Sequence, residues 1–121
     1  MSEWVSVCAL AVLDDPGAHG FSHGDGAWPL HGFVVRTGGE LHAWVNRCPH
    51  AGHRLDWAPH RFLTRDRRLV MCASHGAVFE PHTGLCVGGP CPGALLTRLP
   101  VRVNTAGNVE VEMGKAQAQE R

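Results

Sequence analysis

The chain has 121 residues, with 11 Lys and Arg against 11 Asp and Glu, and a formal net charge of zero when histidine is neutral. This length indicates one domain and leaves no room for a second catalytic domain. The balanced charge provides no basic field for nucleic acid and no acidic tail, and a hydrophobic content of 44% is typical of a folded protein.

The first residues contain no early Lys or Arg, and the short apolar run over 9–13 ends at Asp14-Asp15-Pro16. We therefore expect no signal peptide and no membrane span, and a cytoplasmic location. In a reducing compartment, five cysteines are more often metal ligands or free thiols than a disulfide framework.

The first half of the chain predicts short strands joined by turns. Strand-forming side chains indicate a strand over 3–8. Residues 14–28, with a proline, four glycines and Asp-containing turns, predict a loop. Strands are expected over 32–37 and 41–46, on either side of a Gly-Gly pair at 38–39 that is typical of a hairpin turn.

The second half continues this pattern, and we expect the fold class to be all-β because no useful apolar stripe of period 3.6 and no internal repeat occurs. An arginine-rich connector is expected over 54–67. It is followed by short strands over 69–71, 77–80, 95–103 and 108–112, with turns over 81–84 and 105–107. The expected organisation is a single domain over 1–113 and a flexible C-terminal tail over 114–121.

Two short cysteine–histidine clusters carry the chemistry of the chain. C-P-H at 48–50 and C-A-S-H at 72–75 each place one thiolate and one imidazole where an expected strand turns into a loop. Two thiolates and two imidazoles are the ligand set of a [2Fe–2S] centre in which the cysteines hold one iron and the histidines hold the other. The pattern predicts Cys48, His50, Cys72 and His75 as cofactor-binding and metal-binding residues, and it indicates one-electron transfer.

From about residue 3 to residue 112, the chain resembles the Rieske [2Fe-2S] domain family. The resemblance rests on Cys48-Pro49-His50-Ala51-Gly52, on Cys72-Ala73-Ser74-His75-Gly76 and on the stretch from Thr83-Gly84 to Gly88-Gly89-Pro90. The last stretch looks like the proline-containing third loop that covers the cluster in that family. The resemblance implies one [2Fe–2S] cluster and a Rieske-type antiparallel β sandwich, with a small cluster-binding subdomain over about 46–92 formed by two ligand loops.

The resemblance also bears on the redox potential. High-potential members of the family carry a disulfide between the ligand loops, whose cysteines would fall at His53 and Ser74 here. They also carry a serine and a tyrosine that donate hydrogen bonds to sulfur, where this chain has Ala77 and Phe79. Because such hydrogen bonds raise the potential, we expect a low value, on the order of −150 mV. Low-potential soluble members resemble the ferredoxins of aromatic-ring oxygenase systems.

The expected function is therefore that of a monomeric one-electron carrier, from a flavin-dependent reductase to a terminal oxygenase or another redox enzyme. Neither a membrane nor a nucleic acid is an expected partner. No stand-alone catalysis is expected, because the chain has no motif for a mononuclear iron site and no nicotinamide fingerprint. Three alternatives stay open: the small redox subunit of a nitrite-reductase-like complex, a cluster-based redox sensor, and a structural Cys2His2 zinc site. Zinc fingers usually pair like ligands, whereas both pairs here are mixed.

The remaining thiols, histidines and arginines support weaker predictions. Cys8 is expected in the core, and Cys86 and Cys91 are expected to be small buried residues, with a short-loop disulfide between them as the alternative. His53 is either a proton-exchanging group near the cluster or a plain loop histidine. The arginines over 61–68 either dock an acidic partner surface or are solvated. Loop positions in solvent are expected for His19, His23, His31, His42, His60 and His82.

Overall fold

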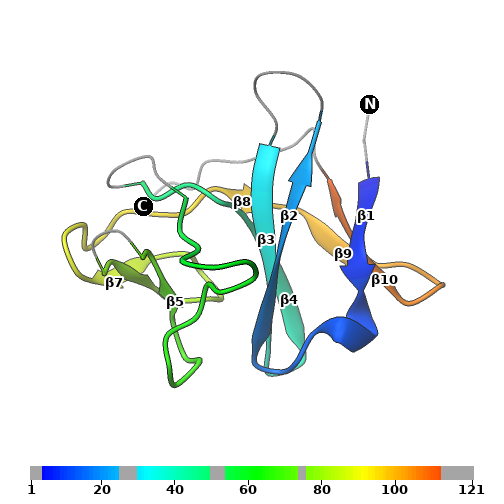
Figure 1. Ribbon diagram of the computed structural model, residues 1–121, viewed down its shortest axis with the longest axis horizontal. Helices are drawn as coiled ribbons and strands as arrows, with labels where there is room; N and C mark the ends of the chain where they lie inside the picture. The colour runs from blue at the N-terminus through cyan, green and yellow to red at the C-terminus, as the bar shows by residue number, and fades with distance from the viewer. Residues whose placement is uncertain (1–3, 25–29, 50–53, 74–75, 113–121) are drawn as a thin grey trace.

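The computed structural model describes residues 4–24, 30–49, 54–73 and 76–112, and within these ranges the chain forms three antiparallel sheets (Figure 1). The elements are β1 Trp4–Ala9, the 3-10 helix η1 Leu10–Val12, β2 Gly17–His23, β3 Leu30–Thr37, β4 Glu40–Val45, β5 Val70–Met71, β6 Val78–Phe79, β7 Cys86–Gly88, β8 Arg98–Leu99, β9 Val101–Val103 and β10 Asn108–Glu112. The expected all-β class is confirmed. The expected tail over 114–121 lies outside the described residues, and no helix within them is long and apolar enough to cross a membrane.

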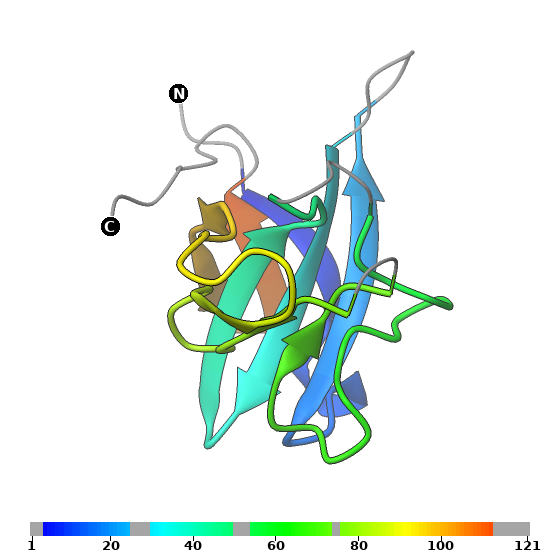
Figure 2. The same ribbon diagram turned by 90° about the vertical axis from the view of Figure 1, so that its left-hand side faces the viewer.

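Two of the sheets form a sandwich, and the third sheet covers the outer face of the four-stranded sheet. The sheet β1-β10-β9 packs on the sheet β2-β3-β4-β8, while β5-β6-β7 lies on the opposite side of the four-stranded sheet (Figures 1 and 2). The inner apolar layer of the sandwich contains Leu13, Val34, Ala43, Leu99, Val109 and Val111. The second apolar layer, beneath the small sheet, includes Phe33, Val35, Trp44, Leu55, Phe62 and Phe79.

Strand β3 lies between these two layers and is buried on both faces. Phe33 and Val35 point into the layer beneath the small sheet, whereas Val34 points into the sandwich. This alternation follows from the two-residue period of a strand. The continuous buried run from Gly32 to Val35 is therefore the signature of a strand with apolar neighbours on both sides.

The prediction of a loop over 14–28 is wrong, because residues 17–23 form β2. This strand pairs with β3 along its whole length, from Gly17 opposite Arg36 to His23 opposite Leu30. Gly20 in β2 and Gly32 in β3 are needed for close packing rather than for turning. A Cβ at Gly20 would lie 3.1 Å from the ring of Phe62, and one at Gly32 would lie 2.5 Å from the ring of Phe21. Glycine within a strand can mark such a close approach.

Two further predictions need correction. The strand expected over 95–103 is divided at Pro100 into β8, which pairs with β4, and β9, which pairs with β10. The two halves therefore belong to different sheets. In addition, Cys86–Gly88 forms β7 where the sequence predicts only a covering loop.

The expected hairpin turn between β3 and β4 is confirmed. Gly38 and Gly39 both have positive φ, at 59° and 80°, which favours glycine. Their N–H groups donate to the carboxylate of Asp15, at 2.9 Å and 2.8 Å. The turn is thereby attached to the segment that leads into β2.

Candidate metal centre

The two predicted ligand cysteines lie in the apolar layer beneath the small sheet. Cys48 follows β4 and is 1% exposed, and Cys72 follows β5 and is fully buried. Cys91 packs against the same layer, so the three cysteines share one neighbourhood. The predicted ligands His50 and His75 lie outside the described residues, as do His53 and Ser74.

The side chain of Asn46 connects the two ends of the first ligand loop by hydrogen bonds. Its side chain is buried at the end of β4. The Oδ1 atom accepts a hydrogen bond from the N–H of Leu55 at 2.7 Å, and Nδ2 donates to Oδ1 of Asp56 at 2.8 Å. Residues on both sides of the loop are therefore attached to one side chain, and Cys48 lies between them in the sequence.

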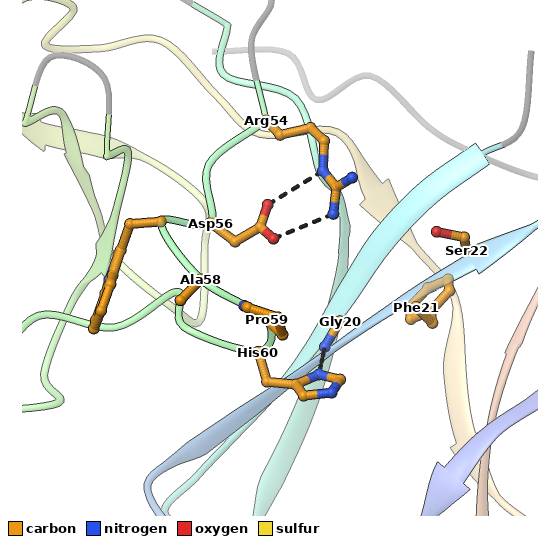
Figure 3. A pocket seen from close by; sticks show the side chains of 9 residues that line it. Gly20, Phe21, Ser22, Arg54, Asp56, Ala58, Pro59 and His60 are labelled. Carbon is orange, nitrogen blue, oxygen red and sulfur yellow. Dashed lines mark hydrogen bonds and ion pairs between the residues drawn. The ribbon is translucent and has the colours of Figure 1, made fainter.

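The carboxylate of Asp56 is held in its ionised form by this arrangement. Arg54 donates to it from Nε at 3.3 Å and from Nη2 at 3.2 Å (Figure 3). Partial burial acts to raise the pKa of Asp56, but the hydrogen bond from Asn46 and the Arg54 guanidinium hold that pKa below its ordinary value. The sequence analysis missed Asn46 and Asp56. The sequence signal that could have found them is the asparagine two residues before the first ligand, Cys48, together with the aspartate that follows the ligand loop.

The backbone of Leu55 links the two ligand loops. Its N–H donates to Asn46, two residues before Cys48. Its carbonyl accepts a hydrogen bond from the N–H of Ala73, directly after Cys72, at 3.0 Å. Because Leu55 is fully buried, water does not compete for these two hydrogen bonds. They tie the loops together in a chain that has histidine and serine at positions 53 and 74, where a disulfide between the loops would need cysteines.

A third segment lies against the second ligand loop. At the end of this loop, the N–H of Gly76 donates a hydrogen bond to the carbonyl of Cys72 at 3.0 Å, and Gly76 has a positive φ of 73°. A Cβ at Gly89 would lie 2.7 Å from Cα of Ala77 and 2.9 Å from the carbonyl oxygen of Gly76. Only glycine allows this approach, so the segment around Gly89 contacts the backbone that follows the second ligand pair.

The residues beside the thiols offer few hydrogen-bond donors. Ala77 and Phe79 are fully buried, and neither side chain has a hydroxyl group. Trp44 is also fully buried in this layer, and within the described part of the chain its Nε1–H has no hydrogen-bond partner. The site is therefore an apolar enclosure for soft sulfur ligands.

Cys86 and Cys91 form a second thiol pair beside the ligand cysteines. Cys86 is 2% exposed, which confirms the prediction that it is buried, whereas Cys91 is only partly buried. Both thiols are free, with Sγ of Cys91 donating to Sγ of Cys86 at 3.3 Å. Burial raises the pKa of Cys91 to about 12, with further contributions from Cys86, Cys48 and Cys72.

Several histidines expected to be solvated in loops lie instead in strands or in polar networks. His42 on β4 accepts a hydrogen bond at Nδ1 from Arg98 at 3.1 Å, and its Nε2 lies 3.2 Å from Nδ1 of His82. Arg98 also donates to the carbonyl of His82 at 2.8 Å and stacks over Trp44, 4.4 Å from the ring centroid. This network attaches the turn after β6 to β4 and β8. His19, His23 and His31 lie in β2 and β3.

The connector between the ligand loops packs on β2 through His60. Nδ1 of His60 accepts a hydrogen bond from the N–H of Gly20 at 3.0 Å (Figure 3), and its ring stacks on His19 with the centroids 4.0 Å apart. A cavity of about 570 Å³ lies there, bordered by Arg54, Asp56 and Trp57 among others. The exposed connector arginines are Arg61, Arg65, Arg67 and Arg68. Of these, Arg61 lies over the ring of Trp57 at 5.7 Å and Arg67 donates to the carbonyl of Pro16 at 3.3 Å.

Comparison with known families gives one match, in which residues 3–105 fit the model of the Rieske [2Fe-2S] domain. No curated protein matches the chain. A chain in the complex of reduced oxygenase and oxidized ferredoxin of carbazole 1,9a-dioxygenase is 26% identical with a TM-score of 0.69, and the match covers 96% of this chain and 97% of that one.

Two other solved structures share the fold. The ferredoxin of carbazole 1,9a-dioxygenase from Nocardioides aromaticivorans IC177 is 24% identical with a TM-score of 0.69, covering 92% of this chain and 98% of that chain. A Mycobacterium tuberculosis chain assigned as the small subunit of an NADH-dependent nitrite reductase is 23% identical with a TM-score of 0.66, covering 92% and 95%.

Proposed function

Because the chain belongs to the Rieske [2Fe-2S] domain family, we propose that it is a ferredoxin whose cluster is held by Cys48, His50, Cys72 and His75. The cluster of this family supplies reversible one-electron chemistry when it is bound. The observation that carries the proposal is the position of the two thiols. Cys48 and Cys72 follow two different strands, are both buried in one apolar layer, and lie on loops that the backbone of Leu55 ties together.

The residues around the thiols fit this cofactor. Buried cysteines suit a sulfur-ligated iron centre, and Gly89 packs closely against Gly76 and Ala77, so that its segment covers the second loop. Because the side chains of Ala77 and Phe79 cannot donate hydrogen bonds to sulfur, they give the reduced centre no stabilisation. We therefore propose a potential near the low end of the Rieske range, on the order of −150 mV.

The proposed electron acceptor is a terminal oxygenase, and the proposed donor is a flavin-dependent reductase. Similarity to a chain of the carbazole 1,9a-dioxygenase oxygenase–ferredoxin complex, over nearly the whole length of both chains, supports an oxygenase as acceptor. We propose that the chain acts as a monomer in one domain over 1–113 and does not oxidise a substrate by itself. The exposed arginines over 61–68 are proposed to increase the rate of association with an acidic partner surface.

The small subunit of a nitrite-reductase-like enzyme is the second candidate. The Mycobacterium tuberculosis chain shares the fold over 92% of this chain. The two candidates differ in their partners: stable co-purification with a large redox subunit supports the reductase subunit, whereas transient contacts support the ferredoxin.

The first experiment is electron paramagnetic resonance of the dithionite-reduced protein, with iron and acid-labile sulfide measured on the same sample. We expect two irons and two sulfides per chain and an average g value below that of all-cysteine ferredoxins. One zinc per chain, without sulfide or signal, would mean that the ligands are structural, and the electron-transfer proposal would then be wrong.

The second experiment tests the carrier role. NADH, a flavin-dependent ferredoxin reductase and cytochrome c are combined with and without the protein, and the reduction of cytochrome c is followed. We expect reduction to increase in proportion to the protein concentration, and the Cys48→Ser variant to give only the background rate. A cluster-loaded protein that the reductase cannot reduce would favour a sensor.

A further inference from the structure

The thiols of Cys86 and Cys91 are in contact, with Sγ atoms 3.3 Å apart. An S–S bond is about 2.05 Å long, so bond formation needs a movement of about 1.3 Å. Small rotations of the two side chains can supply such a movement. Cys8, the cysteine on β1, packs in the other apolar layer, inside the sandwich.

The backbone brings the two cysteines together. The N–H of Cys86 donates to the carbonyl of Ala94 at 2.8 Å, and its own carbonyl accepts from the N–H of Gly93 at 3.0 Å. These two hydrogen bonds close the loop over 87–92, and the carbonyl of Cys91 accepts from the N–H of Ala94 at 3.1 Å. Both ends of the loop are thus fixed, and Cys91 is held against Cys86.

The closed loop also carries Gly89, which contacts the backbone of Gly76 and Ala77 directly after the second ligand pair. A covalent bond between Cys86 and Cys91 would therefore fasten the segment that covers the second ligand loop. The difference in burial sets the order of reaction: Cys91 is partly exposed and Cys86 is buried.

We propose that Cys86 and Cys91 form a reversible disulfide that fastens the loop over 87–92 against Gly76 and Ala77, the residues that follow the second ligand pair. A small disulfide such as oxidised glutathione is the oxidant. The sulfur of Cys91 attacks it, forming a mixed disulfide and releasing one thiol. The sulfur of Cys86 then displaces the second thiol and closes the bond. Two protein thiols are oxidised to one disulfide, and one glutathione disulfide is reduced to two glutathione molecules.

The first test measures the thiol state of the cluster-loaded protein at equilibrium in glutathione buffers of graded potential. Equilibrium is used because burial raises the pKa of Cys91, which makes exchange slow. The samples are quenched in acid, unfolded and alkylated. The tryptic peptide over 69–98, which holds Cys72, Cys86 and Cys91, is then analysed by mass spectrometry.

In oxidising buffer we expect this peptide to lose two labels, from Cys86 and Cys91, and to keep the label on Cys72. Reducing buffer should restore both labels. Three labels at every potential would overturn the proposal, and so would pairing of Cys91 with Cys72. Cys91→Ser should abolish the change. Cys8→Ser, a cysteine variant in the other apolar layer, should leave it intact.

The second test concerns the fastening of the loop, and it rests on the proposed cluster. The release of iron to a chelator is compared between the oxidised and the reduced protein. We expect release to be several-fold slower from the disulfide form, with no such difference in Cys91→Ser. Equal rates would show that the bond forms without fastening the site. The mass measurement reads the Cys86 and Cys91 thiols directly and can be repeated on protein without a cluster, so failure of the proposed function is distinguishable from failure of this inference.

Discussion

The side chain of Asn46 accepts a hydrogen bond from the N–H of Leu55 at 2.7 Å, across the loop that contains the first ligand pair. Leu55 in turn accepts a hydrogen bond from Ala73, which follows Cys72. A single buried amide at the end of β4 is thus connected to both ligand loops. This connection uses hydrogen bonds where the high-potential members of the family are expected to use a disulfide.

Replacing Asn46 by alanine should loosen both loops. The buried N–H of Leu55 loses its acceptor and the carboxylate of Asp56 loses a donor, which should cost about 2 kcal/mol in the free energy of unfolding. Urea unfolding and the iron content per chain measure the two effects. Asn104→Ala is the matched control, because the Asn104 side chain also makes two hydrogen bonds, both accepted from the backbone in the turn between β9 and β10. It should reduce stability without lowering the iron content. Equal iron content in both variants would contradict the proposed role of Asn46.

Substitution of a proposed ligand should remove the cluster. Cys48→Ser and His75→Ala are expected to lose the visible absorption and the paramagnetic signal, because the remaining ligands cannot hold both irons. Iron analysis and absorption spectra of the purified variants measure this loss. Cys8→Ser should keep both signals, since Cys8 lies on β1 in the other apolar layer. A normal Rieske spectrum in either ligand variant would disprove the ligand assignment.

New hydroxyl groups at positions 77 and 79 should raise the midpoint potential. In the double variant Ala77→Ser and Phe79→Tyr, each hydroxyl can donate a hydrogen bond to sulfur, which stabilises the more electron-rich reduced centre. Redox titration of the holoprotein measures the change. Val78→Thr is the control, because its side chain contacts Gly88 on the other face of β6, and its potential should stay at the wild-type value. An unchanged potential in the double variant would undercut the explanation of the low value.

The stability of the protein should decrease as the pH falls below about 6.5. Burial, followed by the charges of Arg98 and His82, lowers the pKa of His42, although Glu40 and Glu80 act to raise it. Burial and His60 likewise lower the pKa of His19. Because the pKa of each histidine is lower in the folded chain, the unfolded chain binds more protons between the two values. The stability is therefore complete above the unfolded pKa of 6.5 and is lost as the pH falls through the folded values.

Urea unfolding between pH 5 and pH 8 tests this dependence. His42→Gln should reduce the slope of unfolding free energy against pH, and His42→Gln with His19→Gln should reduce it further. A nuclear magnetic resonance titration of wild-type His42 should give a midpoint below 6.5. If both variants kept the wild-type slope, these two histidines would not be the source of the pH dependence.

The sequence by itself determined the all-β class, the hairpin at 38–39, and the family with its cofactor. These features depend on local patterns: the alternation of a strand, the positive φ of a Gly-Gly turn, and ligand types that only a few metal centres accept. They remain visible in the sequence because each depends on neighbouring residues.

Only the tertiary structure decided that the glycine-rich residues 17–23 form a strand, since they pair with β3 and the requirement for glycine at position 20 comes from Phe62, far along the chain. It also revealed the hydrogen bonds from Asn46 to Leu55 and the network of His42, His82 and Arg98. Each of these contacts joins residues far apart in the sequence, or residues whose types are common at the surface. Their role depends on which partners the fold buries beside them, and a single sequence carries no local signal of that burial.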